Sequence, residues 1–238
     1  MSRACREIAL KLGALSRSGE TVGELAHLQP ETRAALRRLQ PDPVDHAEET
    51  LPLPNWRPRP KGIDAVVRWP DGRPRLTLEL KLRKTDWMLW DAYKMIDALN
   101  VEGVGAAYLL VGASAKGWKA RYTHCPQGSK TTELFEAGAR EHQSADLFRA
   151  NAHAWYDLVW GGSARPLRVP TRIRTIRVES AEMQIDGAVG QLRCLRVERA
   201  SHDWLSFSPG WYRGEWPVGV QPCEHYLTWR GIPRQDLP

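Results

Sequence analysis

The chain has few cysteines and no long hydrophobic segment, and these absences exclude several classes of protein. The four cysteines, Cys5, Cys125, Cys194 and Cys223, are far apart and include no Cys-x-x-Cys pair, so neither a disulfide-rich scaffold nor a cysteine zinc site is expected. No apolar run approaches the length of a membrane span. The first residues carry charges where a signal peptide has an apolar segment. These features predict a cytoplasmic protein without a membrane partner.

Two common catalytic signatures are also missing. The glycine-rich stretch GVGAAYLLVGA, residues 103–113, lacks the Lys-Ser/Thr ending of a phosphate-binding P-loop. A Gly-x-Ser-x-Gly nucleophile elbow does not occur, which argues against a serine hydrolase of that type. The candidate chemistry must therefore come from another pattern.

The charge of the chain is basic and dominated by arginine. Lysine and arginine number 34 against 28 acidic residues, which gives a net charge of +6, and 26 of the 34 are arginine. A guanidinium group matches a phosphate better than an ammonium group does, so a polyanionic partner such as nucleic acid is favoured. A genomic bias toward arginine codons accounts for the same excess, and charge alone does not decide between the two.

The order of the expected elements indicates an α/β fold. Periodicity and turn residues predict helices over 3–15, 30–39, 86–100, 132–141 and 144–160, and strands over 63–69, 75–82, 103–114 and within 165–198. Interleaved strands and helices predict a mixed sheet with helices on both faces. We expect a core over residues 1–162. An extension rich in Arg and Trp, residues 163–238, would add a small sheet and serve nucleic-acid or partner binding.

The stretch GIDAVVRWPDGRPRLTLELKL, residues 62–82, places charged side chains in an apolar hairpin. Its second strand points four leucines to one face and Thr77, Glu79 and Lys81 to the other. A two- or four-residue turn at Asp71-Gly72 pairs residues whose numbers sum to 143, so Asp64 lies opposite Glu79. Directly opposed β-carbons are about 4.5–5.5 Å apart. Two carboxylates this close repel unless a cation lies between them.

These residues carry a specific chemical hypothesis. Carboxylate oxygens on adjacent strands suit Mg²⁺, which needs only one or two protein carboxylates. Lys81, on the same face, can hold an attacking water or stabilise charge on a phosphoryl group. The alternative is that Glu79 and Lys81 form a solvated pair on the wet face of an edge strand, an ordinary pattern in antiparallel sheets.

Ile63-Asp64, fourteen residues and then Glu79-Leu80-Lys81 resemble the PD-(D/E)XK motif of restriction-endonuclease-like nucleases. The resemblance covers about residues 60–112, with Gly62-Ile63 where a proline often precedes the acid. It implies a mixed four-stranded sheet flanked by helices and Mg²⁺- or Mn²⁺-dependent cleavage of nucleic acid, DNA ahead of RNA, as in bacterial or phage defence, repair or mobile-element processes. It implies that Asp64 and Glu79 bind metal and that Lys81 assists the nucleophile.

Many members of this family add an acid from the first helix. The candidates for that acid in this chain are Glu7, Glu20, Glu24, Glu48 and Glu49. The resemblance does not choose among them. A catalytically silent nucleic-acid-binding module, a homodimer, and a subunit that is active only in a larger complex also remain open.

Basic side chains around this motif are the candidates for contact with a nucleic-acid backbone. They are Arg83, Lys84, Lys94, Arg172 and Arg174. Arg172 and Arg174 share one face of a strand, where a solvated surface is the alternative. Lys94 alternatively pairs with Asp91 or Asp97 at helical spacing.

Overall fold

The computed structural model describes residues 1–39, 44–45, 49–51, 53, 62–83, 87–119, 138–150 and 167–207. Most of the Pro-rich passage 51–61, the tail from 208 and residues 151–166 lie outside this part of the chain. Its helices include none that is both long and apolar enough to traverse a bilayer.

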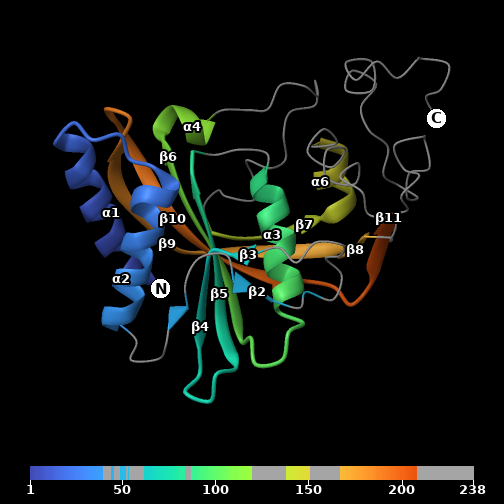
Figure 1. Ribbon diagram of the computed structural model, residues 1–238. Helices are drawn as coiled ribbons and strands as arrows, with labels where there is room; N and C mark the ends of the chain where they lie inside the picture. Colours follow the sequence, from blue (N-terminus) through green and yellow to red (C-terminus); the bar gives the residue numbers. More distant parts are fainter. Residues whose placement is uncertain are drawn as a thin grey trace.

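A mixed seven-stranded sheet organises the described residues (Figure 1). In spatial order its strands are β1 (Val44–Asp45), β4 (Ala65–Arg68), β5 (Pro74–Leu82), β6 (Ala106–Ser114), β10 (Ala188–Arg199), β9 (Arg172–Ile185) and β7 (Ala139–Gln143). Strands β5 and β6 run parallel, and the other neighbours are antiparallel. The α/β class and the flanking helices are as predicted, but the expected sheet of four strands is too small.

The extra width comes from the segment expected to form a separate small sheet. Strands β9 and β10 form a long hairpin, and β10 pairs with β6 from Gly190–Ser114 to Val197–Ala107. They therefore continue the main sheet. A small two-stranded sheet does exist beside it, made by β8 (Leu167–Pro170) and β11 (Trp204–Phe207). Residues 139–141, predicted to end a helix, belong instead to strand β7, which pairs with β9.

Helices cover both faces of the sheet (Figure 1). One side carries α1 (Ser2–Arg17), the short π-helix η1 (Glu24–Leu28) and α2 (Gln29–Leu39). The other carries α3 (Trp87–Ala98), which follows β5 and leads to β6. Two short helices, α4 (Ala115–Lys119) and α6 (Ser144–Ala150), follow β6 and β7. The long helices lie close to the predicted ranges.

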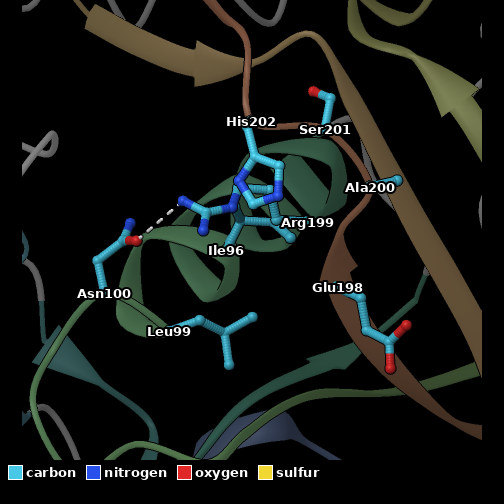
Figure 2. Close-up of a pocket in the computed structure, with 8 residues that line it drawn as sticks. All are labelled: Ile96, Leu99, Asn100, Glu198, Arg199, Ala200, Ser201 and His202. Carbon is cyan, nitrogen blue, oxygen red and sulfur yellow. Dashed lines mark hydrogen bonds between the residues drawn. The ribbon is translucent and has the colours of Figure 1, made fainter.

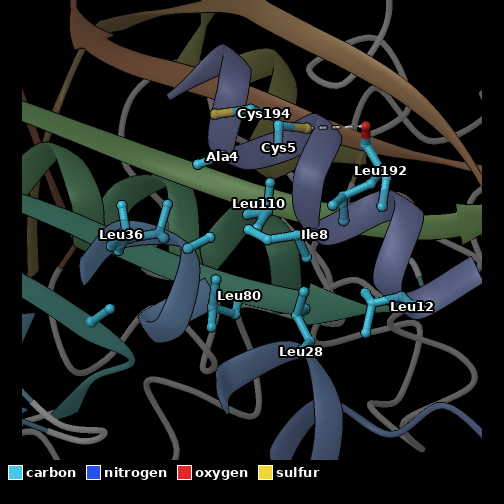
Figure 3. Packing of buried hydrophobic residues seen from close by; sticks show 14 of the residues in the cluster. Ala4, Cys5, Ile8, Leu12, Leu28, Leu36, Leu80, Leu110, Leu192 and Cys194 are labelled. Atoms are coloured by element: carbon cyan, nitrogen blue, oxygen red, sulfur yellow. Dashed lines mark hydrogen bonds between the residues drawn. The ribbon is translucent and has the colours of Figure 1, made fainter. Parts of the chain in front are cut away.

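The leucine face of β5 packs under α1 and α2. Leu76, Leu78, Leu80 and Leu82 are all buried in one cluster with α1, η1 and α2. Figure 3 shows Leu80 in this cluster, near Leu28 of η1 and Leu12 of α1. Each fully buried leucine contributes about 1.5–3 kcal/mol relative to an exposed one. This packing confirms the predicted leucine face and turns Glu79 and Lys81 toward α3.

A second cluster fills the opposite face of the sheet, between it and α3. Met95 and Ile96 of α3 pack with Leu109 of β6 and Leu195 of β10. Every residue from Asp91 to Ala98 is buried, so α3 is enclosed on all sides over this length. The charged residues of α3 must therefore find partners inside the protein.

The hairpin register is as predicted, although its loop is not. Ala65 faces Leu78 and Val67 faces Leu76, so the pair numbers sum to 143, but the pairing ends at Ala65, and Asp64 itself lies outside the strand in the bend before β4. The loop itself has three residues between Trp69 and Arg73, which shifts the tip by one. A β-bulge between Val67 and Arg68 restores the alignment.

Candidate active site

Asp64 lies where the chain passes from one sheet to the next. Strand β3 (Gly62–Ile63) pairs with β2 (Glu49–Thr50), and β4 begins at Ala65, so Asp64 occupies the bend between them. Its Oδ2 accepts a 2.8 Å hydrogen bond from the Leu80 N–H, and its Oδ1 accepts one of 3.2 Å from Gln29 Nε2. The half-buried carboxylate is thus fixed against β5.

Glu79 and Lys94 form a buried ion pair on the face of β5 that meets α3. Lys94 Nζ is 2.6 Å from Glu79 Oε1, and both side chains are almost fully enclosed. The same ammonium donates to the carbonyl oxygen of Gly62 at 3.2 Å and lies 3.9 Å from Asp91 Oδ1. Three oxygen atoms from β5, β3 and α3 therefore surround one cationic nitrogen.

Lys81 continues this ion network toward solvent. Its Nζ is 3.9 Å from Asp91 Oδ2 and 3.4 Å from Glu24 Oε1. Side-chain exposure rises from 5% at Glu79 to 25% at Lys81 and 27% at Glu24. Carboxylates and ammonium groups thus alternate from the interior to a rim that solutes can reach.

Glu24 is the N-terminal acid that the structure brings to this cluster. It opens η1 directly after the extended Gly23, and its Oε2 accepts the Leu82 N–H at 2.9 Å. Two other candidates are paired elsewhere, Glu7 with Arg38 and Glu20 with His27. Glu48 lies outside the described residues, as does the side chain of Glu49.

The cluster carries more negative than positive charge. The acidic groups are Glu24, Asp64, Glu79 and Asp91, and the basic groups are Lys81 and Lys94. When all are ionised, four negative charges against two positive charges leave a net −2. Such an excess in a partly dehydrated site must be relieved by protonation or by a further cation.

The pKa values of the deeper acids reflect this excess. Burial raises the pKa of Asp91 to about 6, although Lys94 and Lys81 oppose the rise. Burial also raises the pKa of Glu79 well above its ordinary range, against the opposing charge of Lys94 and with support from Asp91 and Asp64. Both acids are therefore held less firmly in their ionised forms than surface carboxylates are.

The pKa of Lys81, by contrast, is shifted in favour of its ionised form. Burial alone would lower its pKa, but the carboxylates of Asp91 and Glu24, with a contribution from Asp64, outweigh burial and raise it. This amine remains protonated at neutral pH. It can donate hydrogen bonds and stabilise negative charge, but it is a poor proton acceptor.

The donor chemistry of the cluster suits a hard divalent cation, but the arrangement of the side chains does not yet form its site. Carboxylate oxygens are the preferred ligands of Mg²⁺ and Mn²⁺. The buried Asp91 Oδ2 has no hydrogen-bond partner among the described residues. However, no group of three or more His, Cys, Asp or Glu side chains in that part of the chain is arranged to hold an ion. The Lys94 ammonium separates Glu79 from Asp91.

The other predicted contact residues occupy different positions. Lys94 is buried in the cluster rather than presented at the surface. Arg83, in a left-handed backbone conformation, is exposed and binds Asp186 with a 2.9 Å contact from Nε. Lys84 lies outside the described residues.

Arg172 and Arg174 do share an exposed face of β9, as predicted. Both bind Glu141 of β7, at 2.7 Å from Arg172 Nη1 and 3.2 Å from Arg174 Nη2. The pair thus presents less net positive charge than the sequence indicates.

Asp91 was not predicted as a member of the site. Of the two alternatives for Lys94, the structure has the helical pairing with Asp91, at 3.9 Å, and a buried side chain rather than one presented to a nucleic-acid backbone. The available signal was the composition of α3, because WMLWDAYKMIDA has apolar residues on all sides. Such a helix is usually buried, and its few charged residues then require internal partners.

A separate cavity lies at the C-terminal end of α3 (Figure 2). It measures about 360 Å³ and includes Asn100 and Arg199, whose guanidinium donates to Asn100 Oδ1 at 3.4 Å. Its lining shares no residue with the ion network, so the two features are distinct.

Comparisons with known proteins identified no relative of this chain. A scan against protein-family models found no match, and searches of curated proteins and of solved structures found none of significance. The function must therefore be argued from the residues of this chain.

Proposed function

We propose that the protein is a metal-dependent nuclease whose site is centred on Asp64, Glu79 and Lys81. The observation that carries the proposal is the grouping of an acid on β5, Glu79, and an acid at the bend before β4, Asp64, with a protonated lysine and an excess of negative charge. Glu24 and Asp91 extend this group. Ion pairs that serve stability alone do not need four carboxylates for two ammonium groups.

Each side chain has a role in this proposal. Asp64 and Glu79 would hold a divalent cation, which supplies Lewis-acid stabilisation of a phosphoryl oxygen and lowers the pKa of a water. Lys81, near the rim, would donate to a phosphate oxygen and balance the charge that develops on it. Glu24 and Asp91 hold the Lys81 ammonium in place and keep it protonated.

The charge of the whole chain supports nucleic acid as the polyanionic substrate. The net charge is +6, and most of the basic residues are arginine. A basic protein accumulates near a phosphate backbone, which raises the rate of encounter. DNA is the first substrate to test, with RNA second.

The test compares cleavage and binding. Plasmid DNA, single-stranded DNA and RNA are incubated with wild type in Mg²⁺, Mn²⁺ or EDTA. Asp64→Asn, Glu79→Gln and Lys81→Met should each lower metal-dependent cleavage by about 100-fold or more while binding persists. Lys11→Gln is the matched control, since Lys11 forms a 2.7 Å pair with Glu31 outside the cluster.

One observation favours a second candidate, a catalytically silent nucleic-acid-binding module. Lys94 already neutralises Glu79, which a purely structural ion pair would also do. If wild type binds nucleic acid but neither it nor any variant cleaves with any metal, this second function replaces the first.

A further inference from the structure

The Lys94 ammonium is surrounded by oxygen atoms, as a bound metal cation would be. Its Nζ has Glu79 Oε1 at 2.6 Å, the Gly62 carbonyl oxygen at 3.2 Å and Asp91 Oδ1 at 3.9 Å. Two carboxylates and a backbone carbonyl are also the donors that hard divalent ions use. The ammonium and a divalent ion therefore compete for the same oxygens.

The elements that supply these oxygens are the ones that define the candidate active site. Glu79 projects from β5, Gly62 precedes Asp64 by two residues, and Asp91 also contacts Lys81 through its other oxygen, at 3.9 Å. An ion that replaced the ammonium would thus lie beside Asp64 and Lys81.

We propose that Lys94 is a built-in substitute for the metal, and that a divalent ion binds by displacing its ammonium from Glu79 and Asp91. Lys94 is then a positioning residue that sets the affinity for metal. It keeps the buried carboxylates neutralised when metal is scarce. This inference rests on the proposed function, since it concerns the same site.

The length and attachment of the side chain make the displacement feasible. Lys94 is carried by α3, whereas Glu79 and Gly62 belong to strands, so the ammonium can leave without breaking a backbone ladder. Its four-carbon stem is flexible, and ammonium is a point charge without fixed directional demands.

The test measures metal binding without reference to cleavage. Lys94→Gln keeps a hydrogen-bond donor for Glu79 but removes the positive charge, and Lys94→Ala also clears the space. Mn²⁺ affinity is measured by the loss of the free-ion signal in electron paramagnetic resonance. Both variants should bind Mn²⁺ at least about tenfold more tightly than wild type, which corresponds to about 1.4 kcal/mol.

Thermal unfolding gives a second readout, which remains valid if a variant is unstable. Removal of one partner of a buried ion pair is strongly destabilising, so metal-free Lys94→Ala should melt well below wild type. Saturating Mn²⁺ should raise its melting temperature more than that of wild type. Lys11→Gln, which loses a surface ion pair, should respond as wild type does.

The outcomes separate this inference from the proposed function. If wild type cleaves with Mn²⁺ while both Lys94 variants bind it equally or more weakly, the substitute-cation role is wrong and the nuclease stands. If the variants bind Mn²⁺ more tightly but neither they nor wild type cleave, the role of Lys94 stands and the nuclease proposal fails. If no form binds Mn²⁺, both are wrong.

Discussion

The carboxylate of Asp64 accepts the backbone N–H of Leu80 at 2.8 Å, across the junction between β4 and β5. At this point the pairing of β4 with β5 ends, since Ala65–Leu78 is its last pair. The Asp64 side chain thus accepts a hydrogen bond that a backbone carbonyl would accept if the strand pairing continued. Asp64 therefore has a structural role that must be separated from any catalytic one.

This bond predicts different effects for two substitutions of Asp64. Asp64→Ala leaves the Leu80 N–H without its acceptor and should cost about 1–3 kcal/mol in the free energy of unfolding. Asp64→Asn keeps an oxygen for that N–H and should cost less. Chemical denaturation of the two variants measures the difference. Equal losses would show that the bond contributes little.

The raised pKa of Asp91 predicts an unusual dependence of stability on pH. The folded protein binds this proton more tightly than the unfolded chain, because the pKa is about 6 against an ordinary 3.8. The resulting stabilisation is complete below about pH 4 and is lost as the pH rises through about 6.

Asp91→Asn removes this titration and provides the comparison. The free energy of unfolding of wild type should exceed that of the variant by more at pH 5 than at pH 7.5. The expected change is on the order of 1 kcal/mol. Urea denaturation at both pH values measures it. A difference that grows toward high pH would contradict the assigned direction.

Gly190 allows no side chain where β10 begins its pairing with β6. A β-carbon there would lie 2.4 Å from the carbonyl oxygen of Ala113 and 2.9 Å from the Cα of Ser114, both backbone atoms. Gly190→Ala should therefore destabilise the protein by about 2–4 kcal/mol. Thermal unfolding tests this. The adjacent exposed Val189→Ala is the control and should change stability by less than about 0.5 kcal/mol.

Glu141 predicts how the β9 surface responds to nucleic acid. It binds both Arg172 and Arg174, so Glu141→Gln removes the acid that the two guanidinium groups share, although Arg174 keeps Glu198 at 4.0 Å. If this face contacts phosphates, the variant should bind DNA a few-fold more tightly, with a salt dependence steeper by roughly one ion. Fluorescence anisotropy over a range of salt measures both. Glu31→Gln, an equal change of charge elsewhere, should have a smaller effect.

Local pattern predicted the hairpin and the helices α1, α2 and α3 because their determinants are close in sequence. The leucine alternation of β5 predicted its buried face correctly. The register was also correct for the paired residues, Ala65 with Leu78 and Val67 with Leu76, although Asp64 itself lies beyond the last pair. The prediction assumed a two- or four-residue loop. The three-residue tip shifts the register by one residue and the bulge at Val67 shifts it back, so the two departures cancel.

The pairing of strands that are distant in sequence could not be predicted from local patterns. Strand β10 aligns with β6 although about 80 residues separate them in the chain, and alternation within residues 165–198 does not reveal that partner. The sequence left Glu24 as one of five candidate acids. Its approach to Leu82 depends on the backbone path into η1, which no periodic pattern in the sequence predicts. Helical spacing correctly offered Asp91 as a partner of Lys94, but it could not reveal the shorter ion pair with Glu79, which lies on a strand.

The bulge between Val67 and Arg68 has a practical consequence for engineering. The pairing skips Arg75 between the loop and the Ala65–Leu78 pair, so the register near the loop differs by one residue from the register beyond the bulge. Insertions or deletions between Trp69 and Arg73 can therefore be absorbed locally, without rotating the motif strands against each other. A peptide tag or reporter placed at Asp71 should leave the Ala65–Leu78 pair in register, which makes this loop a suitable attachment point.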